Sequence, residues 1–277
     1  MLFDSHAHIN NENFTDEDRK NLIADIENDE ELDYVMDVGF DLASSLQAVN
    51  DAKENDWCYA AVGVHPHDTE SMDDATLALI KGLSKKDKVQ AIGEIGLDFH
   101  YDFSPRDDQR YWFRKQIQLA NELKMPIIIH SRDADQETMD ILKEEGAFSD
   151  ERKAMFSERI GVDGKMEKDA RVLIHCFSGS AEMAEQYVKL GATISICGPV
   201  TFKNNKKTIK VVEAVPIEYL LVETDTPYLT PVPFRGKPNK PCYVKYTAMK
   251  VAEIKGLSYE EVAKKTCDNA LHFYGIK

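Results

Sequence analysis

Eight short apolar segments recur along the chain, and they limit the folds that it can adopt more than any other feature. Most of them are nearly continuous in Val, Ile and Leu, which is typical of strands that are covered on both faces in a parallel sheet. Polar segments with helical periodicity lie between them. The predicted strands are residues 2–6, 34–39, 59–64, 89–96, 126–130, 171–177, 193–197 and 219–224.

The segments between these strands carry residues that begin and end helices. We expect Thr15 to cap the first helix, Ser104 followed by Pro105 to begin another, and Gly191 to follow the end of a third. Strand and helix alternate through 277 residues without a linker rich in Gly, Ser or Pro. Eight such repeats predict an α/β fold, a single (β/α)8 barrel over residues 1–277, rather than an open doubly wound sheet.

One segment interrupts this alternation. Residues 146–169, between the fifth and sixth predicted strands, are highly charged, and Met155, Phe156 and Ile160 are their sparse apolar residues. We interpret them as an insertion in the barrel, for which a lid, an oligomer contact and an elaborated outer helix are three possible roles. Because the segment contains no histidine, we expect it to modulate substrate choice without carrying the chemistry.

Composition excludes several classes of protein. The apolar fraction of 43% and the charged fraction of 30% are close to globular averages, and no apolar run approaches the length of a membrane span. The first residues lack the basic and apolar stretches of a secretory signal, so we expect a cytoplasmic protein. Five cysteines without a CxxC pair argue against a disulfide framework. The net charge of −15 argues against a broad basic face for nucleic acid, but it allows a local grip on one strand end.

Residue types that bind metals collect at the carboxyl ends of the predicted strands. His6 and His8 point the same way if the first strand is extended, and neutral imidazole is a common ligand of divalent transition metals. The other strand-end residues are Glu94, His130, His175 and Asp225. In a barrel these ends converge on one face, where active sites are built. The six residues therefore predict ligands for two cations, which Glu94 can bridge because a carboxylate has two oxygens.

Basic side chains are also expected at the carboxyl-terminal face of the barrel. Arg235 and Lys237 lie in the Pro-rich segment PVPFRGKPNKP, where an arginine would bind a phosphate through two parallel hydrogen bonds. Lys203 belongs to a second basic patch, which either steers nucleic acid or is a solvated loop. His65, in GVHPH, either touches a phosphate oxygen or is a hydrogen-bonded loop histidine.

Three aromatic residues follow the segment GEIGLD. Phe99, Tyr101 and Phe103 could stack on nucleobases, although a packed loop is the commoner arrangement for aromatic residues at such spacing. The sequence leaves both interpretations open.

Taken together, these motifs resemble those of the TatD family of metal-dependent hydrolases, within the amidohydrolase-like (β/α)8 barrels. The resemblance extends from Met1 to the last predicted helix. It implies that one cation is held by His6, His8, Glu94 and Asp225, and the other by Glu94, His130 and His175. The matching motifs are DSHAH at 4–8, GVHPH at 63–67, AIGEIGLDFHYD at 91–102, PIIIHSRDA at 126–134, IHCFSG at 174–179 and VETDTPYL at 222–229.

Members of this family are described as magnesium-dependent deoxyribonucleases that often work from the 3′ end. The resemblance therefore implies a 3′–5′ exodeoxyribonuclease with two divalent cations, Mg2+ as the expected one and Zn2+ or Mn2+ as alternatives. DNA, as a single strand or a 3′ end, would be the partner. Glu94 would hold both cations, and Asp225 would act as the general base that accepts the proton of the attacking water. We expect a monomer with no membrane partner and no obligate protein partner.

Two other functions are consistent with these residues. Related barrels use a similar metal cluster on carbonyl substrates, so amide, ester or lactone hydrolysis is the alternative reaction. Those relatives often bridge their metals with a carbamylated lysine, whereas this chain offers Glu94, and Arg235 favours phosphate. The third function is a non-catalytic metal-binding protein. Structural zinc sites close four ligands around one ion and favour cysteine, and the set here has more donors than that.

Overall fold

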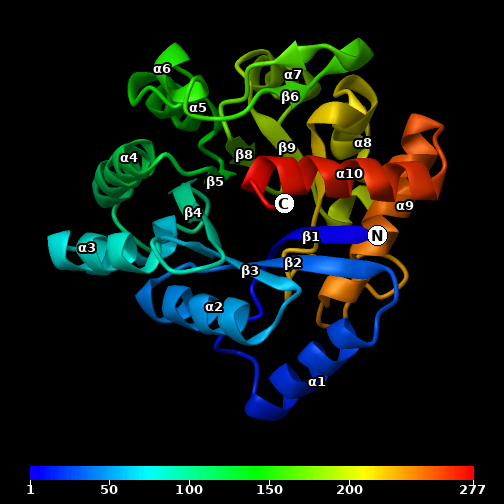
Figure 1. Cartoon of the computed structure of the whole chain (residues 1–277), viewed down its shortest axis with the longest axis horizontal. Helices are drawn as coiled ribbons and strands as arrows, with labels where there is room; N and C mark the ends of the chain where they lie inside the picture. The colour runs from blue at the N-terminus through cyan, green and yellow to red at the C-terminus, as the bar shows by residue number, and fades with distance from the viewer.

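The computed structural model describes residues 1–277, and its main element is a barrel of eight parallel strands (Figure 1). Each strand pairs with the next along the barrel, which confirms the predicted (β/α)8 fold. The Asp225 N–H donates to the His6 carbonyl and the His8 N–H to that of Thr226, both at 2.9 Å, so the last strand rejoins the first. The strands are β1 (Leu2–Ala7), β2 (Leu32–Val38), β3 (Cys58–Val62), β4 (Val89–Asp98), β5 (Ile127–Arg132), β8 (Val172–Ile174), β9 (Thr193–Ile196) and β10 (Leu220–Val222).

Helices follow every strand and lie around the barrel (Figure 1). Thr15 caps the first helix as predicted, since its hydroxyl accepts the Asp18 N–H at 3.1 Å. Gly191, with φ +94°, follows α7 as predicted. No helix combines the length and the apolar character that crossing a membrane requires. The helices are α1 (Asp16–Glu27), α2 (Leu42–Glu54), α3 (Asp74–Leu83), α4 (Arg106–Leu123), α5 (Asp135–Glu144), α7 (Ala181–Lys189), α8 (Lys206–Ala214), α9 (Val244–Lys255) and α10 (Tyr259–Tyr274).

The predicted capping role of Ser104 is wrong. The backbone of α4 begins without a side-chain cap. The Ser104 hydroxyl instead donates to the His67 carbonyl at 2.7 Å and accepts the Glu70 N–H at 3.0 Å. These two bonds join the loop after β4 to the loop after β3. A serine hydroxyl can bond either to its own helix or to another segment, and here the neighbouring loop occupies it.

Apolar side chains form two layers of core. The larger one lies between the strands and the surrounding helices, as expected for strands that are apolar on both faces. The smaller one fills the barrel, with Phe3, Met36 and Ile128 among its members, and α10 joins it through Phe273 and Tyr274. Helix α10 therefore closes the amino-terminal end of the barrel and leaves the carboxyl-terminal end to the loops.

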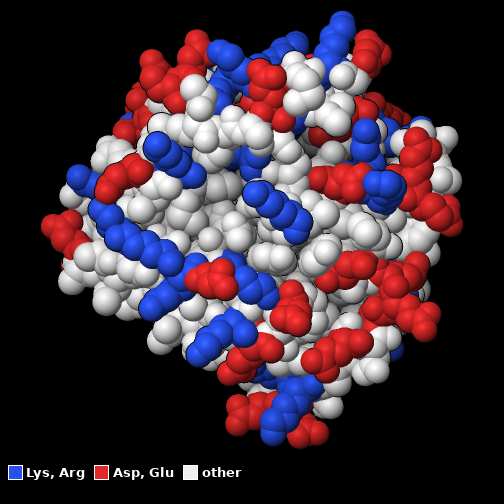
Figure 2. All heavy atoms as spheres, viewed as in Figure 1, with Lys and Arg blue, Asp and Glu red and all other residues white.

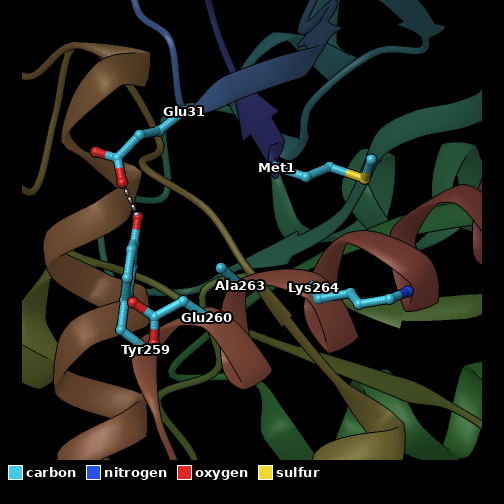
Figure 3. Close-up of a pocket in the computed structure, with 6 residues that line it drawn as sticks. All are labelled: Met1, Glu31, Tyr259, Glu260, Ala263 and Lys264. Atoms are coloured by element: carbon cyan, nitrogen blue, oxygen red, sulfur yellow. Dashed lines mark hydrogen bonds between the residues drawn. The ribbon is translucent and has the colours of Figure 1, made fainter.

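The closed end of the barrel faces the viewer in Figure 1, with α10 in front. On this side, basic and acidic side chains are interspersed and form no broad basic face (Figure 2). A small pocket lies beside the start of α10 and is lined by Met1, Glu31, Tyr259, Glu260, Ala263 and Lys264 (Figure 3). Met1 precedes β1, whereas His6 and His8 lie at the other end of this strand. At a rise of about 3.3 Å per residue, the pocket is therefore on the order of 15 Å from the two histidines.

Residues 146–169 pack at the same amino-terminal end. They form a short helix, α6 (Asp150–Lys153), and a hairpin of β6 (Arg159–Ile160) and β7 (Met166–Glu167). The buried Arg152 guanidinium donates to the Met125 and Ala170 carbonyls, both at 2.9 Å, and these residues precede β5 and β8. The segment is therefore anchored at the opposite end from the strand-end histidines. This position does not suit a lid, and it gives the segment no contact through which to select a substrate.

Candidate active site

The structure brings together all six residues that were predicted as a cluster. His6 lies in β1 and His8 follows it, while His130 lies in β5 and His175 follows β8. Glu94 lies in β4, is 3% exposed, and is the centre of the cluster. Asp225 follows β10. Each side chain arises at the carboxyl-terminal end of a parallel strand, which is why residues far apart in the sequence converge here.

Four of these residues surround one point. The Nε2 atoms of His6 and His8 lie 3.2 Å apart, and each lies 3.4 to 3.5 Å from Glu94 Oε2. Asp225 Oδ1 lies 3.9 Å from His6 Nε2 and 3.5 Å from His8 Nε2. Four tetrahedral ligands at about 2.1 Å from one ion would be about 3.4 Å apart. The spacing and chemistry of these four donors therefore suit a divalent cation.

The other carboxylate oxygen of Glu94 faces a second group. Glu94 Oε1 lies 2.8 Å from His130 Nδ1 and 2.7 Å from His175 Nε2, and these two nitrogens are 3.4 Å apart. His65 Nε2 lies 3.7 Å from the same oxygen. The group could hold a second cation, and His65 is a further nitrogen donor for it. Glu94 alone contributes an oxygen to both groups.

Several histidines of the site are arranged to offer a lone pair. The His8 Nδ1 lies 2.7 Å from the Val38 carbonyl, which assigns the proton to that nitrogen and leaves Nε2 free to bind a cation. Burial and the positive charge of His175 lower the pKa of His6. Burial and His130 lower the pKa of His65 well below its usual range. The lowered pKa values favour the neutral form of His6 and His65, which a metal ligand needs. Burial would also lower the pKa of His8, but a hydrogen bond to Asp225 and the charge of Glu94 raise it.

The two carboxylates of the site are ionised. Burial by itself would raise the pKa of Glu94, but the positive charges of the surrounding histidines, His175 first, lower it well below its usual range. Burial also opposes ionisation of Asp225, and a hydrogen bond from His8 lowers its pKa nevertheless. The site thus gathers negative charge where cations would replace the histidine protons.

Sequence reasoning missed Asp98 and His67, which support the second group. Asp98 Oδ2 lies 3.0 Å from His130 Nε2 and 3.0 Å from His67 Nε2. A carboxylate on the outer nitrogen of a ligand histidine fixes its tautomer and strengthens it as a ligand. The signal was available, since Asp98 is four residues after Glu94 and an even spacing on a strand points both to the same side.

Glu223 was also missed. It is fully buried, and its Oε1 lies 3.5 Å from His175 Nδ1. Burial would lower the pKa of His175, but Glu94 and Glu223 raise it well above its usual value. Three buried polar atoms, His6 Nδ1, His175 Nδ1 and Glu223 Oε2, otherwise have no hydrogen-bond partner. Glu223 is therefore placed to hold both ligand histidines from behind, and its spacing of two from Asp225 was the available signal.

The predicted substrate contacts occupy loops on the same rim. Arg235 and Lys237 are exposed in the loop after β10, and Lys203 is exposed after β9. The two loops are joined, because the Val232 N–H donates to the Thr201 hydroxyl at 2.9 Å. The Arg235 guanidinium packs over the Phe202 ring at 4.4 Å. No carboxylate lies within ion-pair distance of these three basic side chains, so their charges are available to a ligand.

A comparison with protein families shows which family this chain belongs to. The model of the family described as TatD related DNase matches residues 3–275. The chain belongs to the TatD family. It is 46% identical to the Bacillus subtilis protein named uncharacterized metal-dependent hydrolase YabD, over 100% of both chains. It is 33% identical to the uncharacterized metal-dependent hydrolase YcfH of Escherichia coli K12, over 100% of this chain and 96% of that one.

Solved structures of TatD relatives share the fold. The structure of YJJV, a TatD homolog from Escherichia coli K12, matches with a TM-score of 0.84 and 24% identity, over 100% of this chain and 98% of that one. At this identity the match concerns the fold. The TatD relatives matched in sequence are named metal-dependent hydrolases, which agrees with the two donor groups that surround Glu94.

Proposed function

We propose that this TatD-family chain is a metal-dependent hydrolase that cleaves phosphodiester bonds in DNA, as an exodeoxyribonuclease acting from the 3′ end. The position of Glu94 carries the proposal. Its Oε1 faces His130 and His175 at 2.7 to 2.8 Å, and its Oε2 faces His6 and His8 at 3.4 to 3.5 Å. One carboxylate between two donor groups suits a two-metal hydrolase, because each of its oxygens can contribute to one ion.

The residues present suit two divalent cations. When bound, such ions lower the pKa of a water molecule and neutralise charge on the phosphate. His6, His8, Glu94 and Asp225 would hold one ion, and Glu94, His130 and His175 the other. Imidazole-rich groups favour Zn2+, whereas Mg2+ and Mn2+ prefer oxygen ligands, so the three metals are to be compared directly.

Asp225 is placed to accept the proton of the attacking water. Its side chain is 15% exposed, compared with 4% for Glu94, so water reaches it more readily. Its lowered pKa keeps the carboxylate ionised at neutral pH, as a base must be. Its Oδ1 atom also lies beside His8 Nε2, at the edge of the first donor group.

The basic residues on the rim support a phosphate substrate. Arg235, Lys237 and Lys203 are exposed and unpaired, and they come from the two loops that follow β9 and β10. His65 Nε2 lies 3.7 Å from Glu94 Oε1, where it would contact a phosphate oxygen or serve the second cation. A carbonyl substrate would leave these cations without a partner.

The test is a substrate panel with metal-loaded protein. Labelled single-stranded DNA, duplex DNA, DNA with a 3′-terminal phosphate, RNA and a set of lactones are incubated with protein loaded with Mg2+, Mn2+ or Zn2+. Cleavage of single strands with shortening from an open 3′ end is expected, and the 3′ phosphate should slow it. Asp225→Asn should abolish cleavage, whereas Asp163→Asn, at an exposed position in residues 146–169, should leave it unchanged. Lactone hydrolysis without DNA cleavage would refute the proposal.

A further inference from the structure

Two aromatic side chains stand exposed beside the second donor group. Tyr101 is 49% and Phe103 63% exposed, and both lie in the loop between β4 and α4. Their rings stack on each other, with centroids 5.2 Å apart and an angle of 15° between the ring planes. Phe99, in contrast, is covered by the Arg106 guanidinium at 4.3 Å and packs against the core. Only the outer two of the three aromatic residues are therefore available to a ligand.

A chain of contacts joins this pair to the second donor group. The His67 ring meets the Phe103 ring edge-on at 4.8 Å and the Tyr101 ring at 5.6 Å. His67 Nε2 lies 3.0 Å from Asp98 Oδ2, which lies 3.0 Å from His130 Nε2. Only His67 and Asp98 thus separate the aromatic pair from His130, whose other ring nitrogen, Nδ1, would hold a cation. A phosphate at the donor groups would place an adjacent base near the two rings.

An unpaired cation completes the surface. Arg132, at the end of β5, is exposed, and its guanidinium lies 4.7 Å from the centre of the Tyr101 ring. No carboxylate lies within ion-pair distance of it, unlike the neighbouring Arg106, which pairs with Asp102 at 2.6 Å. A guanidinium over a ring still has N–H groups that can bind a phosphate oxygen.

The loop that carries the pair is held in place by its own hydrogen bonds. Asp98 Oδ1 accepts the His100 and Tyr101 N–H groups, both at 3.0 Å. Gln109 is fully buried and donates to the Asp98 carbonyl at 3.1 Å and to the Ser104 carbonyl at 2.9 Å. The rings are therefore exposed on an ordered support, and binding a planar ligand there would cost little conformational entropy.

We propose that Tyr101, Phe103 and Arg132 form a subsite that binds an unpaired nucleotide of the substrate strand, with its base on the aromatic pair and its phosphate on the guanidinium. The inference rests on the proposed phosphodiester cleavage and names the residues that would bind the base and the adjacent phosphate of the strand. A base inside a duplex has both faces covered by its neighbours, whereas an unpaired base offers a face for stacking. The subsite therefore selects single-stranded or frayed ends over intact duplex.

The test compares two substrates that differ only in their bases. One is a labelled single-stranded oligonucleotide, and the other is an oligomer of the same length made only of abasic tetrahydrofuran phosphates. Stacking on one aromatic side chain changes binding by roughly 5- to 150-fold. The metal-loaded parent should therefore show a kcat/KM that is higher for the base-bearing strand by a factor in that range.

Variants of the subsite distinguish the effect of an aromatic ring from the effect of side-chain size on kcat/KM. Phe103→Leu and Tyr101→Leu keep an apolar side chain without a ring, and they should lower kcat/KM on the base-bearing strand while leaving the abasic strand unaffected. Phe103→Trp should preserve the preference for bases. Tyr111→Leu is the matched control, because Tyr111 is 50% exposed on the outside of α4 and contacts Trp112 and Lys115 instead.

Each outcome decides the matter. Equal kcat/KM of the parent on both strands, or Leu variants that match Tyr111→Leu, would overturn the subsite while leaving phosphodiester cleavage intact. A parent that cleaves neither strand would refute the proposed function and the subsite together. A Leu variant that melts well below the parent and loses activity on both strands would show that the ring supports the loop, which also overturns the subsite.

Discussion

Replacing Glu94 by glutamine should weaken both metal groups at once. The substitution keeps the shape of the side chain but removes its charge and turns one oxygen into an N–H2 donor. Whichever way the amide is oriented, one group loses its only Glu94 oxygen. If the N–H2 replaces Oε1, it faces His130 and His175 at 2.7 to 2.8 Å; if it replaces Oε2, it faces His6 and His8 at 3.4 to 3.5 Å.

The size of the effect follows from these contacts. An interaction with a charged group contributes about 1.5–3 kcal/mol, which corresponds to roughly 10- to 150-fold in an equilibrium constant. The group that faces the new N–H2 should lose at least that much cation affinity, because a ligand is removed. The other group keeps an oxygen but loses the negative charge, so its affinity should fall by a similar factor. In the proposed reaction both ions act at the phosphate, so kcat should fall by orders of magnitude.

The assay measures metal content and turnover on the same samples. Purified parent and Glu94→Gln are dialysed against a metal buffer at several free concentrations, bound metal is counted by mass spectrometry, and DNA hydrolysis is followed in parallel. Glu185→Gln is the matched control, because Glu185 is exposed on α7 and makes no ion pair. Full occupancy of both groups in Glu94→Gln, with turnover close to that of the parent, would show that Glu94 only supports the fold and that the bridging role is wrong.

Three further predictions concern other parts of the chain. Arg235→Lys should lower kcat/KM on DNA, with a loss of about 1–3 kcal/mol in transition-state binding and no change in metal content, because lysine lacks the planar two-point contact. An unchanged kcat/KM would remove Arg235 from the site. Glu223→Gln should weaken metal binding roughly 10- to 100-fold in titrations, and an unchanged affinity would mean that the ligand histidines need no support from it. Asp169→Asn should lower the free energy of unfolding by about 3–5 kcal/mol in urea, because it leaves the buried Arg159, now 2.9 Å from Asp169 Oδ1, without its partner. Burial would raise the pKa of Asp169, but hydrogen bonding from His272 and the charge of Arg159 lower it. The contribution of Asp169 to the free energy of unfolding is therefore present above about pH 4 and is lost as the pH falls through the folded-state pKa. A difference in stability between parent and variant that stays constant down to acid pH would contradict this.

The sequence predicted the barrel and the convergence of the six candidate ligands because both depend on order along the chain. Continuous apolar runs identify strands that are covered on both faces, and alternation with helices makes those strands parallel. Once the strands are parallel, their carboxyl ends share one face, so His6 and His130 had to lie on that face even though β1 and β5 are far apart in the sequence. No side-chain contact had to be known for that conclusion.

The supporting residues could not be predicted with the same certainty, because their roles depend on which partner each side chain reaches. Asp98 and Glu223 are spaced to face the site, but spacing does not say that one holds His130 and the other His175. Ser104 shows the same limit. Its position was suited to a helix cap, and its hydroxyl instead binds the backbone of the neighbouring loop.

The location of residues 146–169, in contrast, follows from connectivity alone. In a (β/α)8 barrel the segment after a strand lies at the carboxyl-terminal end, and the segment that joins a helix to the next strand lies at the amino-terminal end. These residues follow α5 and precede β8, so they had to lie away from the site, where Arg152 anchors them. Two of its charged side chains, Arg152 and Arg159, are buried and bind the Ala170 carbonyl and Asp169, which explains how a charged segment contributes to stability here.

Asp98 connects the two halves of the proposed chemistry. One of its oxygens holds His130 and His67, and the other holds the backbone of His100 and Tyr101. A loss of this carboxylate would therefore loosen a metal ligand and the aromatic pair at the same time, and activity alone could not tell the two effects apart. Substitutions at the exposed ring of Phe103 remove its contacts with Tyr101 and His67 but leave these hydrogen bonds in place, because the ring takes no part in them. Substitutions at Phe103 thus test the preference for bases, and Glu94→Gln tests separately whether one carboxylate bridges the two cations.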